Sequence, residues 1–528
     1  MPCPSSCPPG LLALMAPGLA LMATFSLPSH AGDRRALPVE KPPGVKGRTL
    51  ILLDVNTKSP VRIISENFLS LQLDPSIIHD GWLDFLSSRR LVTLARGLAP
   101  AFLRFAGKRT DFLQFHNVKN PAKSRGGPGP DYYLKNYEDA RSLDKLYNFA
   151  DCSGLHLIFA LNALRRNPNN SWNSSNALSL LKYSASKKYN ISWELGNEPN
   201  NYRTLIGRSV NGSQLGKDYI QLRSLLQLIR TYSRANLYGP NIGRPRKNVI
   251  ALLEGFMKVA GSTVDAVTWQ HYYIDGRVAK ATDFLKTRLL DTLSDQIRKI
   301  QKVVNTYTPG KKIWLEGVGA TSAGGMNNLS NSYAAGFLWL NTLGLLASQG
   351  IDVVVRHSFL DHSHNHLVDQ NFNPLPDYWL SLLYKRLIGP KVLAIHVAGL
   401  QRKPRPGRVI RDKLRIYAHC TSYHNHNYVR GSITLYIINL HRSRKKIKLA
   451  GTLRDKIVHQ YLLQPYGKDG LHSKSVQLNG QPLAMVDDGT LPELKPRPLR
   501  AGRTLVIPPL TMSFYVVKNV NALACRYR

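Results

Sequence analysis

Residues 192–200 read Ser-Trp-Glu-Leu-Gly-Asn-Glu-Pro-Asn, and the pattern around this stretch decides the fold of the chain. The apolar run predicts a strand that ends at Leu195. The turn at Asn197, Glu198 and Pro199 falls where a loop to the next helix should begin. In barrels of alternating strands and helices, the residues that carry chemistry stand at this junction. Taken alone, the turn could equally be an ordinary solvated loop.

The chain on both sides of residues 192–200 alternates short apolar runs with longer segments of helical spacing. The strand-like runs are Ala101–Phe105, Leu155–Leu161, Ile191–Leu195, Ala235–Gly239, Ala266–Trp269, Lys312–Val318 and Ile351–Arg356. The helical segments include Gln214–Arg234, Ala281–Tyr307 and Ser332–Gly350. This rhythm predicts an α/β protein with a (β/α)8 barrel over residues 69–395. An open doubly wound sheet is the alternative, but no glycine-rich phosphate-binding motif opens any of these units.

Residues 396–528 follow a different pattern, because short strand-like runs are separated by turn and basic residues without a long helical segment. This pattern predicts a β-sandwich. The segment 48–68 contains a strand-like run, Thr49–Asp54, that could close an edge of the sandwich. Within the barrel, residues 119–142 include a stretch rich in proline and glycine that predicts an exposed loop.

The charge of the chain is strongly unbalanced, since 71 Lys and Arg residues face 33 Asp and Glu residues and give a formal net charge of +38. Such an excess indicates a polyanionic partner: nucleic acid, an anionic lipid surface or a sulfated glycan. The apolar run Leu11–Phe25 ends at a small-residue cleavage pattern, Ser29-His30-Ala31, and predicts a signal peptide over residues 1–31. An uncleaved anchor is the alternative, although no comparable apolar run follows. A secreted basic protein meets glycosaminoglycans, so we expect a sulfated glycan and no nucleic acid.

Glycosylation sequons and cysteines fit a secretory route. The sequons are at Asn169, Asn173, Asn190, Asn211 and Asn328. Cys3 and Cys7 precede the expected cleavage point, so the mature chain keeps Cys152, Cys420 and Cys525. An odd number permits at most one internal pair. Cys420 and Cys525 share the C-terminal segment and are the expected disulfide, which leaves Cys152 as a free thiol or an intermolecular site.

Several long stretches of the chain resemble the heparanases, a family of endo-β-glucuronidases with a (β/α)8 barrel and a C-terminal β-sandwich. The resemblance covers nearly everything after the signal peptide. Its most specific stretches are Leu91–Asp111, Trp172–Ala177, Ile191–Asn200, Val267–Tyr273 and His366–Leu380. The resemblance implies that Glu198 is the general acid for cleavage of a glycosidic bond and that Asn197 lies beside it. The cleft residues implied in the same way are Asp74, Lys108, His271, Tyr273 and Gln270, which replaces a histidine of the family.

The second carboxylate that the resemblance requires is out of place. Hydrolysing members have Gly-Glu after the strand that corresponds to residues 311–315, whereas this chain has Glu316 followed by Gly317. Side chains alternate between the faces of a strand, so Glu316 shares the face of Trp314. We expect that face to point toward the outer helices, unless a bulge at Gly317 turns Glu316 back into the barrel. In this respect the chain resembles the non-hydrolysing branch of the family.

Basic residues gather in clusters with few matching acids. A cluster on a barrel loop contains Arg244, Arg246 and Lys247, and two in the C-terminal part contain Arg402, Lys403 and Arg405, and Arg444, Lys445 and Lys446. One such run is usually a solvated face, but several in one β domain predict a positive field in which arginine pairs with sulfate and carboxylate groups. The alternating histidines at 362–366 lack a complete ligand set, so we expect no metal and no other cofactor.

The combined pattern predicts a secreted protein that binds heparan sulfate or heparin without hydrolysing it. We expect it at the cell surface or in the extracellular matrix, associated peripherally with proteoglycans and without a transmembrane segment. There it would compete with, or modulate, active heparanase. The alternative is an active endo-β-glucuronidase of the retaining type, with Glu198 as the acid and Glu316 as a displaced nucleophile. A nucleic-acid-binding protein is supported by charge alone.

Overall fold

The computed structural model describes Cys3 and residues 50–79, 82–116, 137–274, 280–321, 325–360, 364–399 and 413–527. Its centre is a closed barrel of parallel strands in the order β10-β11-β12-β3-β4-β7-β8-β9. These strands are β3 (Leu69–Leu73), β4 (Ala101–Phe105), β7 (Leu155–Leu161), β8 (Ile191–Leu195), β9 (Leu237–Ile242), β10 (Ala266–Ile274), β11 (Lys312–Thr321) and β12 (Val353–Arg356). The predicted eight-stranded barrel is therefore confirmed.

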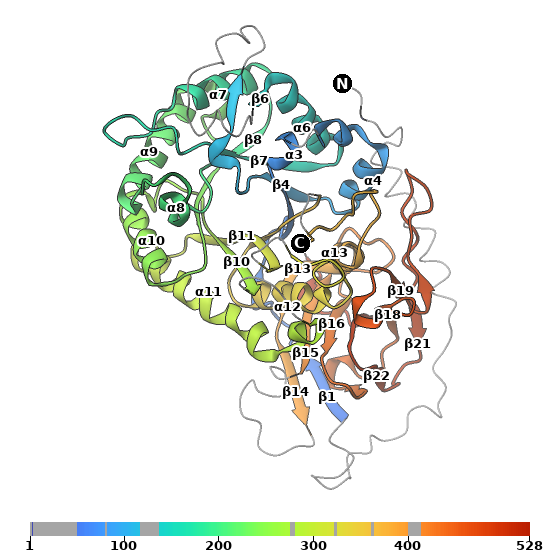
Figure 1. The fold of residues 1–528 in the computed structure, drawn as a ribbon. Helices are drawn as coiled ribbons and strands as arrows, with labels where there is room; N and C mark the ends of the chain where they lie inside the picture. The colour runs from blue at the N-terminus through green and yellow to red at the C-terminus, as the bar shows by residue number, and fades with distance from the viewer. Residues whose placement is uncertain are drawn as a thin grey trace.

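The helices between these strands form the outer layer of the barrel (Figure 1). They are α3 (Ser76–His79), α4 (Arg89–Gly97), α6 (Ala140–Cys152), α7 (Ser175–Ser186), α8 (Tyr202–Ile206), α9 (Gly212–Leu228), α10 (Lys247–Ala260), α11 (Thr287–Tyr307), α12 (Ala335–Ser348) and α13 (Pro376–Leu387). Helix α12 is buried on nearly every side, because strands of the C-terminal part pack against it. A Cβ added to Gly344 of α12 would lie 2.5 Å from the ring of Tyr417, so glycine permits this close approach.

Side chains inside the barrel form a cluster of their own, and this cluster shows which face of each strand is the interior. The ring centroid of Trp314 lies 5.2 Å from that of Phe102 and 4.1 Å from that of Tyr238. Ile158 belongs to the same interior cluster. Leu315, the next residue on β11, belongs instead to the large core that the strands share with the helices. The face of β11 that carries Trp314 is therefore the interior face.

The remaining strands form two sheets beside the barrel, which we call the C-terminal β region (residues 388–527 with β1 and β2). One sheet has the order β14-β1-β17-β22, and the other runs β2-β13-β15-β16-β23-β18-β19-β20 with β21 paired to β18. The strands are β1 (Leu50–Val55), β2 (Arg62–Ile63), β13 (Ile388–Leu393), β14 (Ile395–Gly399), β15 (Leu414–Thr421), β16 (Ile433–Asn439), β17 (Lys445–Leu449), β18 (Val458–Pro465), β19 (Val476–Leu478), β20 (Gln481–Pro482), β21 (Arg497–Leu499), β22 (Leu505–Ile507) and β23 (Thr511–Val517). Side chains of both sheets, such as Leu53 and Tyr515, share one core. Strand β1 lies inside its sheet rather than at an edge, and it pairs with β17 in parallel.

Two disulfides join the described cysteines. Cys420 of β15 pairs with Cys525 as expected, across a sequence separation of 105 residues, and a loop of this length corresponds to about 4–5 kcal/mol in the chain-entropy model. Cys152, at the end of α6, pairs with Cys3. The expectation that Cys152 is unpaired is therefore wrong. This second disulfide and the removal of residues 1–31 exclude one another within one chain.

Part of the predicted organisation differs from the structure or falls outside the described residues. The expected loop 119–142 ends before residue 142. Strand β6 (Tyr137–Asp139) pairs in parallel with β5 (Gln114–His116), and α6 follows directly. Apart from Cys3, the predicted signal peptide lies outside the described residues, as do Arg402, Lys403 and Arg405. Among the described helices, none combines the length and the apolar character needed to cross a membrane.

Candidate functional site

Glu198 is held at the carboxyl end of β8 by a tight turn. Gly196 has a φ of +79°, and a Cβ at this position would lie 2.2 Å from the hydroxyl of Tyr202. The backbone N–H of Asn197 donates to Oδ2 of Asp111 at 3.0 Å. Glu198 itself has a φ of +48°, and left-handed non-glycine residues are costly and gather at functional sites. The turn therefore presents Glu198 in a fixed position.

The carboxyl group of Glu198 is partly buried beside the backbone of Gly243, whose added Cβ would fall 2.8 Å from Oε1. Burial raises the pKa of Glu198 above its ordinary value, although a hydrogen bond from Asn201 and the charge of Lys108 oppose this shift. A general acid has to keep its proton near neutral pH. The environment of Glu198 supports that role.

A polar network lies beside Glu198 in the barrel interior. The amide oxygen of Asn197 accepts hydrogen bonds from Nη2 of Arg104 at 3.2 Å and from Nε2 of Gln270 at 3.1 Å. Arg104 also donates to Oε1 of Gln72 at 3.1 Å, and Nε2 of Gln72 lies 3.0 Å from Nδ1 of His357. Gln270, which the resemblance placed in the cleft, is thus part of this network, whereas Gln72, Arg104 and His357 were not predicted.

The sequence did contain a signal for these missed residues. The fourth residue of β3, β4 and β8 is Gln72, Arg104 and Glu194, respectively, and each is the one long polar side chain in a buried strand. A long polar side chain at the fourth position of three buried parallel strands indicates a shared interior network, because buried polar groups need partners.

Glu316 points into the barrel interior, so the prediction that it faces the outer helices is wrong. It shares the face of Trp314, as alternation requires, but that face is the interior. The side chain of Glu316 is 0% exposed, and its Oε2 lies 3.5 Å from Nε of Arg104. The same Nε donates to Oε1 of Glu194 at 2.9 Å.

Glu316 and Glu194 compete for the single charge of Arg104. Burial raises the pKa of Glu316 well above its ordinary value, repulsion from Glu194 raises it further, and Arg104 opposes both effects. One guanidinium cannot neutralise two buried carboxylates, so this environment favours the protonated form of Glu316. A neutral carboxyl group sealed from solvent cannot approach a sugar to within the roughly 3–3.5 Å that nucleophilic attack requires.

Gly317 occupies a β-bulge. The register of β11 shifts between Glu316 and Val318 against β12, and Gly317 has a φ of +101°. A Cβ at this position would lie 3.2 Å from Cγ of Gln270 and 3.7 Å from Oε1 of Gln72. Position 317 therefore faces the polar network beside Glu198, one residue, or about 3.3 Å, nearer the strand's carboxyl end than Glu316. The bulge places both Glu316 and Gly317 on the interior side of the barrel, and Gly317, which is nearer the carboxyl end of the strand, has no side chain.

Two residues that the resemblance placed in the cleft, His271 and Tyr273, point into the helical layer instead. The hydroxyl of Tyr273 hydrogen bonds to Thr342 of α12. Burial, with the nearby charge of Arg244, lowers the pKa of His271 to about 3. Alternation along β10 places Tyr272 on the other face, where its ring centroid lies 6.3 Å from that of His357.

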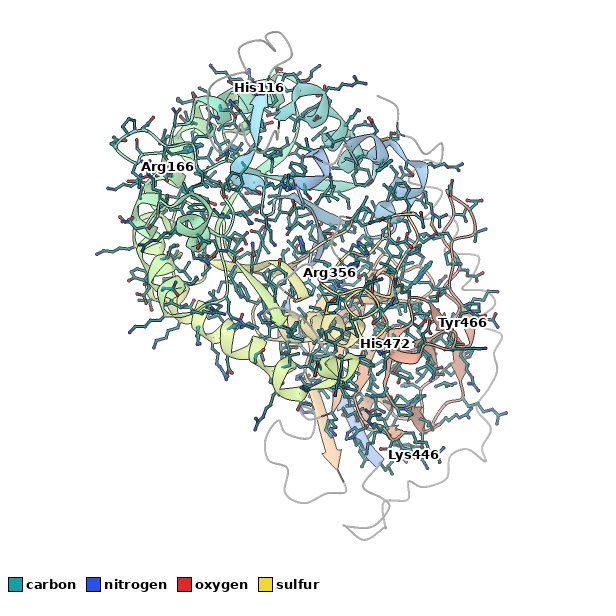
Figure 2. All side chains as sticks on the ribbon, viewed as in Figure 1. His116, Arg166, Arg356, Lys446, Tyr466 and His472 are labelled. Atoms are coloured by element: carbon teal, nitrogen blue, oxygen red, sulfur yellow. A yellow bond between two sulfur atoms is a disulfide. The ribbon has the colours of Figure 1, made fainter. Side chains whose placement is uncertain are left out.

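The other predicted residues divide between two places. Asp74 and Lys108 follow β3 and β4, and Arg244, Arg246 and Lys247 join β9 to α10, so all five lie at the same end of the barrel as Glu198. Arg444, Lys445 and Lys446 belong instead to the C-terminal β region. Lys446 lies at the opposite end of the molecule from His116 (Figure 2).

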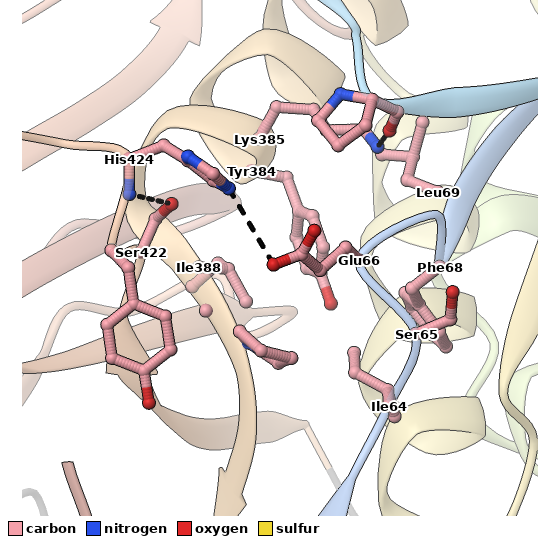
Figure 3. A pocket seen from close by; sticks show the side chains of 14 residues that line it. Ile64, Ser65, Glu66, Phe68, Leu69, Tyr384, Lys385, Ile388, Ser422 and His424 are labelled. Carbon is pink, nitrogen blue, oxygen red and sulfur yellow. Dashed lines mark hydrogen bonds and ion pairs between the residues drawn. The ribbon is translucent and has the colours of Figure 1, made fainter. Parts of the chain in front are cut away.

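The described residues offer no metal centre beside this site, and a small cavity lies at the opposite end of the barrel strands. No group of three His, Cys, Asp or Glu side chains there could hold a metal ion. A cavity of about 50 Å³ lies between the barrel and the C-terminal β region, with His424 and Glu66 3.7 Å apart at its wall (Figure 3). It borders Leu69 and Pro100, where β3 and β4 begin. Glu198 stands at the other end of the strands.

A closed barrel with an acid at the carboxyl end of its strands is typical of glycoside hydrolases. The chain matches the model "Glycosyl hydrolase family 79, N-terminal domain" over residues 136–344, and it belongs to the heparanase family. It is 79% identical to "Inactive heparanase-2" of Mus musculus, over 99% of this chain and 98% of that protein. It is 46% identical to "Heparanase" of Mus musculus, over 90% and 94% of the two chains. A 4-O-alpha-L-rhamnosyl-beta-D-glucuronidase from Fusarium oxysporum 12S shares the fold with a TM-score of 0.64 and 14% identity, over 88% of this chain and 100% of that one.

Proposed function

We propose that this chain binds heparan sulfate and heparin outside the cell and does not hydrolyse them. The observation that carries the proposal is the transposed pair on β11: Glu316 is sealed against Arg104, and Gly317 offers no carboxylate where the interior opens toward Glu198. The relatives named "Inactive heparanase-2" and "Heparanase" support a family glycan ligand without turnover. Within this proposal Glu198, Asn197, Gln270, Asp74 and Lys108 contact the glycan.

Two basic surfaces supply the charge for binding. One is the loop with Arg244, Arg246 and Lys247 beside the candidate site. The other is on β17, where Lys446 is exposed and the next residue, Ile447, is buried in the core. Arginine and lysine on such surfaces pair with sulfate and carboxylate groups and release counterions, so binding weakens as salt rises.

The proposal includes the organisation of the chain. It has a signal peptide over residues 1–31, a barrel over 69–395 and a basic β-sandwich over 396–528 joined by the segment 48–68. The protein acts in the extracellular matrix or at the cell surface, where it competes with active heparanase for the same chains. The disulfide between Cys3 and Cys152 is the one observation that stands against cleavage after Ala31.

Immobilised heparin and a cleavage assay test the proposal together. We expect the full chain to be retained at physiological salt and to leave the length of heparan sulfate unchanged. The double variant Arg444→Glu/Lys446→Glu should elute at lower salt. A matched control, Lys299→Glu/Lys302→Glu on the exposed face of α11, carries the same change in charge and should elute later than that variant. If the native chain is not retained on heparin, the binding proposal is overturned. If the native chain shortens heparan sulfate and Glu198→Gln abolishes this cleavage, the chain is an active endo-β-glucuronidase.

A further inference from the structure

A surface groove lies where the barrel meets the C-terminal β region, and it contains one residue of the barrel, Asn328. The opposite wall comes from residues 466–475 and includes Tyr466, Asp469, His472 and Lys474. The groove has a volume of about 500 Å³, within the range of roughly 300–1,000 Å³ for pockets that hold small ligands. It is far from the candidate site in sequence and is not needed for the proposed function.

Direct contacts hold Asn328 against the opposite wall. Nδ1 of His472 lies 3.0 Å from the backbone oxygen of Asn328, and Nζ of Lys474 donates to Oδ1 of Asn327 at 2.6 Å. Tyr466 is 48% exposed, and it lies close to His472 on the surface (Figure 2). The groove therefore combines an open aromatic ring with charged and polar side chains.

Asn328 is also the first residue of a glycosylation sequon, Asn328-Leu329-Ser330. Its side chain is exposed in a left-handed turn with a φ of +61°. Asn328 lines the groove, and no hydrogen bond to its side-chain amide is found among the described residues. A sugar attached to Asn328 would therefore start at the groove.

We propose that Asn328 carries an N-linked glycan whose first sugars lie in this groove against Tyr466. The apolar face of a pyranose ring packs on an aromatic ring, as other apolar groups do, while Asp469 and Lys474 offer an acceptor and a donor to its hydroxyl groups. The glycan then bridges the barrel and the C-terminal β region. This inference rests on the secretory route in the proposed function.

Asn211 provides a matched comparison within the same chain. It is also an exposed sequon asparagine, and its side chain accepts a hydrogen bond from the backbone N–H of Gln214 at 2.8 Å at the start of α9. Helix α9 lies across the barrel from β18 and β19 (Figure 1). A glycan at Asn211 is therefore far from the groove.

The test is site-resolved glycopeptide mass spectrometry of the full chain secreted from mammalian cells, before and after treatment with a peptide N-glycosidase. We expect both sites to carry glycan, with release from the native protein slower at Asn328 than at Asn211. Each tenfold difference between the two release rates corresponds to about 1.4 kcal/mol of packing between the glycan and the groove. After denaturation both sites should be released equally fast. Tyr466→Ala, at an exposed position, should remove most of the difference, and Lys474→Ala should reduce it without any change at Asn211.

Each outcome bears on the proposal. Equal release at the two sites of the native protein, or a slow release at Asn328 that Tyr466→Ala leaves unchanged, overturns it. An unmodified Asn328 on a chain that is glycosylated at Asn211 also overturns it and leaves the secretory route intact. Absence of glycan from every sequon overturns both the inference and the secretory part of the proposed function.

Discussion

Replacing Glu316 by glutamine tests whether Glu316 is a buried, protonated side chain or an ionised carboxylate that could act as a nucleophile. In the folded protein burial and repulsion from Glu194 raise the pKa of Glu316 well above its ordinary value, whereas the unfolded chain releases this proton above about pH 4.3. The native protein therefore loses stability, relative to Glu316→Gln, as pH rises from the unfolded pKa toward the folded one. The relative gain of the variant is about 1.4 kcal/mol per pH unit, or up to about 2.7 kcal/mol between pH 5 and pH 7.

Chemical denaturation of both proteins at pH 5, 6 and 7 measures this difference. At pH 5 the variant should lie within about 1 kcal/mol of the native protein, because glutamine keeps the size and the neutral state of the protonated side chain. Glu254→Gln, on the exposed side of α10, is the control and should follow the native curve. A difference between Glu316→Gln and the native protein that stays constant with pH, or that shrinks as pH rises, refutes the assignment of the proton to Glu316.

Three further outcomes follow from the same geometry. Arg104→Met leaves Glu194 buried without its counter-ion and should lower the free energy of unfolding by about 3–5 kcal/mol; a loss below 1 kcal/mol would contradict the central place of Arg104 in the network. Gly317→Ala should cost about 1–3 kcal/mol, because an L side chain is strained at a φ of +101°, whereas Gly207→Ala, also at positive φ but with nothing near its Cβ, separates backbone strain from the contact with Gln270. A non-reducing peptide map should show a mature chain that begins at Gly32, as the proposed signal peptide requires; a peptide that joins Cys3 to Cys152 would instead rule out cleavage after Ala31.

The barrel could be predicted because its signal is long and repeated. The bounds expected for Ala101–Phe105, Leu155–Leu161 and Ile191–Leu195 agree with β4, β7 and β8 to the residue. In each case an apolar run is followed by a turn or a helical segment, so local pattern and tertiary structure agree. The predicted pair Cys420 and Cys525 is confirmed for a related reason, since both residues belong to one β region.

The orientation of β11 could not be predicted, because alternation separates two faces without saying which is the interior. Trp314 and Leu315 are both large and apolar, and both sides of a barrel strand are buried. The choice depends on the distant partners of Trp314, Phe102 and Tyr238. Tyr273 of β10, which the resemblance placed in the cleft, lies on the outer face of its strand against Thr342. Cys3 and Cys152 are 149 residues apart, and no local pattern links them.

The bulge at Gly317 has a consequence for chemical labelling of the family. Reagents that trap retaining glycosidases form an ester with the nucleophilic carboxylate, which has to be ionised and within reach of the cleft. In this chain Glu316, next to the bulge, is enclosed and has a pKa raised well above its ordinary value, and Gly317 has no side chain. In a mixture that contains a hydrolysing relative, such a reagent would mark the relative and leave this chain unmarked, even where both occupy the same glycan.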